Sequence, residues 1–134
     1  MSVNTILDNI KTIVENSVTV NWSNETRFNV FIPEDYPAVC YQTSSLAETG
    51  DLLTNTRRDR AFGIEIFYVK QATVNENQRN FTNLVEGLME SLRNSGDLNS
   101  NVYGWMIEAD IKDRGTEDNA EFIAQIKIEG IQSK

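Results

Sequence analysis

A run of alternating residues in the middle of the chain constrains its fold more than any other feature. Positions 62 to 69 alternate between two sets of side chains. One set is large and apolar throughout and comprises Phe62, Ile64, Ile66 and Tyr68, whereas the other comprises Gly63, Glu65, Phe67 and Val69. Because successive side chains of a strand point to opposite faces, this pattern predicts a central β-strand. One face of that strand is expected to pack on a core, and the other is expected to be only partly covered.

Dense positive charge precedes this strand. Arg57, Arg58 and Arg60 surround Asp59, and we expect them to project beyond the sheet. Three interpretations compete: a phosphate-binding site, a solvated strand end, and a surface that pairs with carboxylates of a neighbouring copy. The net charge of -8 disfavours the first interpretation and supplies acidic partners for the third. We favour the third, because the guanidinium fork makes bidentate contacts with carboxylates.

Periodicity predicts two amphipathic helices and several further strands. Apolar residues recur at helical spacing over 2–16 and again from Phe81 to Leu92, where Met89 belongs to the buried stripe. Alternating or apolar runs bounded by turn residues predict strands over 18–22, 27–32, 38–42, 102–112 and 120–130. Turns are expected at 23–25 and 33–37. A hairpin connection over 113–119 is expected to put the apolar rows of the last two strands on one face.

The polar segment from 43 to 56 is predicted to be a long loop or hairpin arm. Thr, Ser, Asn, Gly and Asp dominate it, and Leu46, Leu52 and Leu53 are its isolated apolar points. Loops of this length inside a compact domain are usually functional or disordered. Two interpretations stay open: the leucines dock on a partner, or they pack back on their own domain.

The order of these elements predicts an α+β fold. We expect one mainly antiparallel sheet with both helices packed on one face, in a single domain that spans residues 1–134. A chain of 134 residues with 40% apolar residues is long enough to bury a core without disulfides.

The residues that commonly carry chemistry are sparse. The chain contains no histidine, which excludes Ser-His and Cys-His catalytic arrangements and most zinc sites. The single cysteine, Cys40, lies in an apolar run and is predicted to be a small buried hydrophobe. Carboxylate pairs at 34–35, 108/110 and 117–118 fall in turns or on the solvent side of a strand, and no glycine loop suits phosphates. We therefore expect no catalytic, cofactor or metal site, and a soluble protein, since no apolar run approaches membrane-spanning length.

Over nearly its whole length the sequence resembles the tail terminator proteins of long-tailed bacteriophages. The features that carry the resemblance are the amphipathic helix through Ile13 and Val14, the strand Pro37-Ala-Val-Cys-Tyr, the polar excursion after it, the strand Arg60-Ala-Phe-Gly-Ile-Glu-Ile-Phe-Tyr-Val, the helix from Phe81 to Leu92 and the closing hairpin. Element order and size define this family more than invariant residues do.

The resemblance implies a structural protein of the virion and no enzyme. It implies a homohexameric ring on the head-proximal end of the tail tube, which stops tube polymerisation and presents a surface for head–tail joining. The implied partners are other copies of the chain, the tail tube protein and the head-side connector protein, with DNA passing through the lumen without specific binding. Assembly would take place in the host cytoplasm, without a membrane or a cofactor. The alternatives are another head–tail connector or neck protein, and a non-viral protein-interaction module.

A ring of this kind needs two different patches on each subunit, because its interface is head to tail. The arginine group is one candidate patch. The acidic hairpin residues Glu117 and Asp118 are candidates for the other, and Leu46, Leu52 and Leu53 are predicted to reach a neighbouring subunit or the tube.

Overall fold

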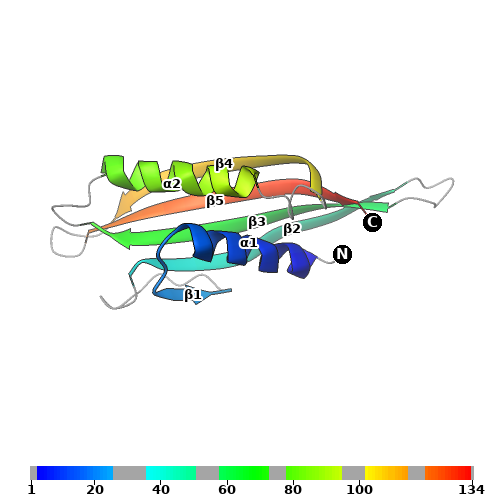
Figure 1. The fold of residues 1–134 in the computed structure, drawn as a ribbon. Helices are drawn as coiled ribbons and strands as arrows, with labels where there is room; N and C mark the ends of the chain where they lie inside the picture. The colour runs from blue at the N-terminus through cyan, green and yellow to red at the C-terminus, as the bar shows by residue number, and fades with distance from the viewer. Residues whose placement is uncertain are drawn as a thin grey trace.

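A computed structural model describes residues 3–25, 36–50, 58–72, 78–94, 102–114 and 120–133. Within these ranges the chain forms two helices, α1 (Val3–Ser17) and α2 (Gln78–Arg93). It also forms five strands: β1 (Trp22–Asn24), β2 (Ala38–Gly50), β3 (Arg58–Gln71), β4 (Val102–Arg114) and β5 (Glu121–Ser133). The strands make one sheet in the order β1-β2-β3-β5-β4, and both helices lie on the same face of it (Figure 1). The predicted α+β fold is confirmed.

The strand predicted to be central, β3, lies in the middle of the sheet. It pairs antiparallel with β2 on one side and with β5 on the other, and β5 pairs antiparallel with β4. The exception is β1, whose three residues pair parallel with Ala38, Val39 and Cys40 at the start of β2. The sheet is therefore mixed but mainly antiparallel, as predicted.

The core lies between the two helices and the face of the sheet that they cover. On β3 this face carries the predicted apolar set, Phe62, Ile64, Ile66 and Tyr68, all of them buried. Matching rows come from β5 (Phe122, Ala124, Ile126, Ile128), from α1 (Val3, Ile6, Ile10, Val14) and from α2 (Phe81, Val85, Leu88, Leu92). Full burial of each large side chain contributes about 1.5–3 kcal/mol. This packing stabilises the helices, because most helical stability in proteins comes from an apolar face packed on a core.

Phe81 joins α2 to the sheet at the centre of this core. Its ring stacks on Tyr68 with centroids 5.9 Å apart and on Phe122 with centroids 5.4 Å apart. Met89 packs against the same core, as the helical stripe predicted. The last two strands also place Ile107 opposite Ile128 and Ala109 opposite Ile126, which confirms that their apolar rows share one face.

On the second face of the sheet, here called the outer face, the large apolar residues that the structure describes as buried lie at the end near β1. Phe67, Val69 and Cys40 are buried there. Tyr36, which precedes β2, crosses this end and donates a hydrogen bond from its hydroxyl to Glu121 Oε2 on β5 at 2.5 Å. The predictions that this face is partly covered and that Cys40 is a buried hydrophobe are both confirmed.

The N-terminal strand differs from the prediction. A strand was expected over 18–22 and a turn over 23–25, but β1 occupies Trp22–Asn24. Val18 and Val20 alternate because they pack partly against the core, and they belong to no strand. Asn21 fixes the chain beside β2, since its backbone N–H donates to Pro37 O at 2.8 Å and its side chain donates to Tyr36 O at 2.7 Å. The predicted strand over 27–32 lies outside the described residues.

Of the two forms predicted for 43–56, a long loop or a hairpin arm, the described part of the segment is a hairpin arm. Strand β2 continues to Gly50, and its residues from Ser45 to Gly50 pair with β3. No apolar alternation marks this segment as a strand, and its residues 43–47 are exposed on both faces. Positions 51–57 lie outside the described residues.

The arginine group also lies differently from the prediction. We expected it to project beyond the sheet, but β3 begins at Arg58, and Asp59 and Arg60 pair with β2 on one side and with β5 on the other. These positions are strand residues because the extension of β2 and the end of β5 supply hydrogen-bonding partners on both sides.

Candidate functional site

The site is the end of the sheet that extends beyond α1. We call it the tip and define it as residues 45–50 of β2, 58–63 of β3, 102–106 of β4 and 129–133 of β5. In Figure 1, β2 and β3 run past the N-terminal end of α1 into this region. Among the side chains that the structure describes, the two large apolar ones that are markedly exposed both lie here: Leu46 is 59% exposed and Met106 is 50% exposed.

A β-bulge in β2 decides which side chains face which way at the tip. Thr43 pairs with Ile64 on the helix-covered face, and the next pair is Ser45 with Gly63, so β2 carries one extra residue. As a result Ser45 and Ala47 lie on the outer face, whereas Leu46 lies opposite Phe62 on the helix side. Without the bulge, the strand's period of two would place Leu46 on the outer face.

Gly63 permits the bulge to sit close to β3. A Cβ atom at position 63 would lie 2.6 Å from Ser45 Oγ and 2.8 Å from Ser44 Oγ, both shorter than van der Waals contact. A larger residue at position 63 would therefore force the two serine hydroxyls to move.

On the helix side of the tip, Leu46 has a positively charged neighbour. Leu46 pairs with Phe62, and the next pair on that face is Glu48 with Arg60. Arg60 is half-buried and takes part in further interactions. Diagonal neighbours of this kind in an antiparallel pair lie within reach of long side chains. The helix side of the tip therefore presents an apolar and a cationic group together.

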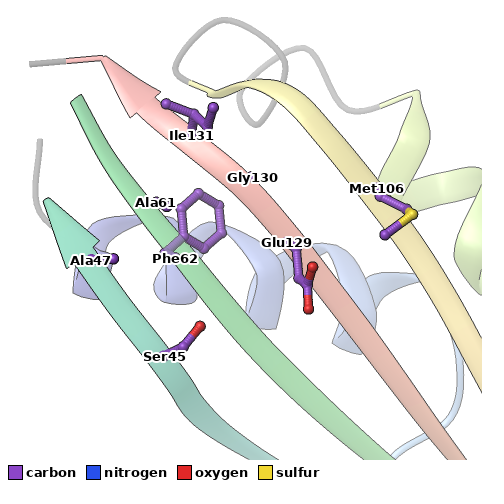
Figure 2. A pocket seen from close by; sticks show the side chains of 8 residues that line it. All are labelled: Ser45, Ala47, Ala61, Phe62, Met106, Glu129, Gly130 and Ile131. Carbon is purple, nitrogen blue, oxygen red and sulfur yellow. The ribbon is translucent and has the colours of Figure 1, made fainter. Parts of the chain in front are cut away.

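On the outer face, the tip is hollowed. A depression of about 330 Å³, which we call the hollow, is lined by Ser45, Ala47, Ala61, Phe62, Met106, Glu129, Gly130 and Ile131. Figure 2 looks onto this face with α1 behind the sheet, and shows one or more lining residues on each of β2, β3, β5 and β4. Small side chains on β2 and β3 leave the space open, Met106 and Ile131 bound it, and Glu129 is exposed in it.

A polar belt separates the hollow from the covered end of the outer face. Glu65 accepts hydrogen bonds from Gln42 Nε2 at 3.0 Å and from Gln125 Nε2 at 3.3 Å. The same register row continues with Lys127 on β5 and Glu108 on β4. Side chains from β2 and β5 thus donate hydrogen bonds to the carboxylate of Glu65 on β3, in the middle of the outer face.

Of the residues predicted to form an interface, the structure brings Leu46 and Arg60 together on one face. Leu46 is 59% exposed, so most of this side chain is not packed back on its own domain, and docking on a partner stays a prediction. Arg58 lies at the start of β3, and its side chain is outside the described part of the structure. The remaining predicted residues, Arg57, Leu52, Leu53, Glu117 and Asp118, fall outside the described residues.

Sequence reasoning missed the hollow. Its signal is the small residues Ser44, Ser45, Ala47, Ala61 and Gly63, which become neighbours only through the register of β2 on β3. Glu129 and Met106 were likewise not singled out, because each looks like an ordinary strand residue until the strands are aligned.

The described residues offer little for other chemistry. They contain no group of three or more His, Cys, Asp or Glu side chains that could hold a metal ion. No helix among them is long and apolar enough to cross a membrane. Glu108 and Asp110 are exposed on β4, as predicted.

Tyr41 is the unusual polar group of the core. It is fully buried beneath α1, and its hydroxyl has no hydrogen-bond partner among the described residues. Burial raises the pKa of Tyr41 far above its ordinary value, and the nearby charge of Glu15 raises it further. The Nζ of Lys11 lies 5.8 Å from the ring centroid.

Comparison with known proteins gave no match: no protein-family model fits the chain, and no curated protein is significantly similar to it.

Proposed function

We propose that this chain is a structural virion protein that caps the head-proximal end of a phage tail tube, in the manner of the tail terminators that its sequence resembles. As a ring of identical subunits it stops tube polymerisation and provides the surface for joining the head. The observation that carries the proposal is the tip, which bears exposed Leu46 on one face of the sheet and exposed Met106 on the other. Exposed apolar groups rimmed by polar residues are typical of surfaces that bind other proteins.

The charge of the chain suits a ring around DNA. A net charge of -8 on each subunit gives the assembled ring an acidic character. An acidic lumen repels phosphates and lets DNA pass without specific binding. Under this proposal the partners are other copies of the chain, the tail tube protein and the head-side connector, and the protein has no catalytic activity.

Electron microscopy of tails assembled without this protein tests the proposal. Overlong tails that shorten to a uniform length when the wild-type protein is restored are the expected result. Tails of normal length that fail to join heads would instead make the protein a connector or neck component. Tails of normal length that join heads normally would refute a role in the virion and leave an interaction module.

A further inference from the structure

We propose that Leu46 of one copy of this chain inserts into the hollow of a second copy, so that copies associate head to tail through their tips. The inference rests on the proposed function, in which copies form a ring, and specifies the contact between subunits. Leu46 lies on β2 with 59% of its surface exposed, and the hollow of about 330 Å³ has room for a leucine side chain.

The lining of the hollow suits an apolar occupant. Ala47 and Ala61 leave the space open, and the apolar side chains of Met106 and Ile131 bound it (Figure 2). Insertion of Leu46 would remove its own exposed surface and that of Met106 from water in one contact. Burial of this kind of apolar surface is the main favourable term in protein association.

The charges beside the two surfaces are complementary. Arg60 lies on the face of Leu46, one residue pair away, whereas Glu129 is exposed in the hollow. When Leu46 enters a neighbouring hollow, a guanidinium therefore approaches a carboxylate. This match favours a second copy over a nucleic acid, because Glu129 repels phosphates. It also provides local attraction between chains that each carry a net charge of -8.

The two surfaces lie on opposite faces of one sheet, which fixes the kind of assembly. A two-fold dimer would need both surfaces of each copy to face the same partner, and opposite faces cannot do so. Each copy therefore offers Leu46 to one neighbour and its hollow to another. Such heterologous contacts close into a ring or continue as a filament.

A charge exchange tests the contact. Arg60→Glu and Glu129→Arg should each weaken self-association several-fold, measured by sedimentation velocity on the full chain. A mixture of the two variants should recover association, because the new carboxylate of one meets the new guanidinium of the other. If association recovers only when the two variants are mixed, the loss in each variant is due to this contact and not to the change in its net charge.

A second pair of variants tests the apolar part. Leu46→Asp removes the inserted group, and Ala47→Trp fills the hollow at an exposed position. Each variant alone should associate about tenfold more weakly than the wild type, the loss expected when burial of a leucine is forfeited. Mixed together, they should form dimers and no larger species, since one intact surface remains on each. Thr43→Asp, on the same face of β2 but before the bulge, is the matched control and should associate normally.

Circular dichroism and thermal melting identify any variant that fails to fold. Variants of both pairs that fold and associate like the wild type would overturn the proposal. So would a mixture of the charge variants without recovery, or a wild-type chain that stays monomeric up to about 1 mM. Variants that self-associate normally but fail to cap tails would assign Leu46 to a tube contact, which overturns this inference and leaves the proposed function standing. If the copies associate through the tip but the variants have no effect on tails, the contact between copies stands and the proposed function is refuted.

Discussion

Replacing Tyr41 by phenylalanine should stabilise this protein. The hydroxyl of Tyr41 is fully buried, and none of the described residues forms a hydrogen bond with it. A buried polar group left without a partner costs about 1–3 kcal/mol. Tyr41→Phe keeps the ring and its packing, and we expect it to raise the free energy of unfolding by about 1 kcal/mol near pH 7, or Tm by roughly 3–5 °C.

The stabilisation should grow in alkaline solution. The pKa of Tyr41 is raised in the folded state, by burial first and by the charge of Glu15 second, while its pKa in the unfolded chain stays near the ordinary value of about 10. Below that value the phenol is neutral in both states and the titration costs nothing. Above it only the unfolded chain ionises, so wild-type stability falls by about 1.4 kcal/mol for each pH unit from this group alone. Tyr41→Phe removes this loss, and the difference between the two proteins should widen above pH 10.

Urea unfolding at a series of pH values between 7 and 11 measures both effects. Tyr36→Phe is the matched control, because the Tyr36 hydroxyl donates to Glu121 Oε2 at 2.5 Å, and Glu121 is only 7% exposed. That substitution should destabilise the fold by about 1.5–3 kcal/mol, since it leaves a buried carboxylate short of a donor. A destabilising Tyr41→Phe, or a difference from wild type that does not widen above pH 10, would refute the reasoning.

Two further predictions concern the tip. Reversing the charges of Arg57, Arg58 and Arg60 together should weaken ring or tail assembly and leave the circular dichroism spectrum unchanged, because the group is expected to pair with carboxylates of a neighbouring copy; a triple variant that caps tails normally would show the assignment to be wrong. Gly63→Ala should destabilise the fold by about 1 kcal/mol in urea unfolding, because its Cβ would lie 2.6 Å from Ser45 Oγ. Gly87→Ala in α2 is its control and should stabilise by up to about 1 kcal/mol, since nothing lies within 4 Å of the added atom. Equal effects at the two glycines would contradict the account of the bulge.

Where one side of an element is buried, the sequence predicted the fold well. The alternation from Phe62 to Val69 and the helical stripe from Phe81 to Leu92 each reflect contact with one core, and both appear in the structure as expected. Periodicity carries this information because burial selects apolar residues at every second position of a strand and at every third or fourth position of a helix.

Where burial is absent or incomplete, the same reasoning was undecided or failed. Residues 43–47 of β2 are exposed on both faces, so they carry no apolar period, and the sequence left open whether the segment is a loop or a hairpin arm. Val18 and Val20 show an error, since they alternate without belonging to a strand. Leu46 and Arg60 were both singled out from the sequence, but their position on one face depends on the register and the bulge. Those are properties of pairing between distant segments, which no local pattern encodes.

The extra residue of β2 changes which of its residues, odd-numbered or even-numbered, face the helices. Before the bulge the odd-numbered residues Val39 and Tyr41 face the helices, and after it the even-numbered Leu46 does. Deleting one residue between them would remove the bulge but leave Leu46 opposite Phe62 on the helix side, because the pairs beyond the bulge would keep their register. If the strand instead kept its length and lost the bulge, so that Ser44 paired with Gly63, Leu46 would lie opposite Ala61 on the outer face, at the hollow of its own subunit. Ala47 would then take its place on the helix side. A slip of the pairing by one residue, with no change in the sequence, would therefore convert a surface offered to neighbours into one that closes on itself.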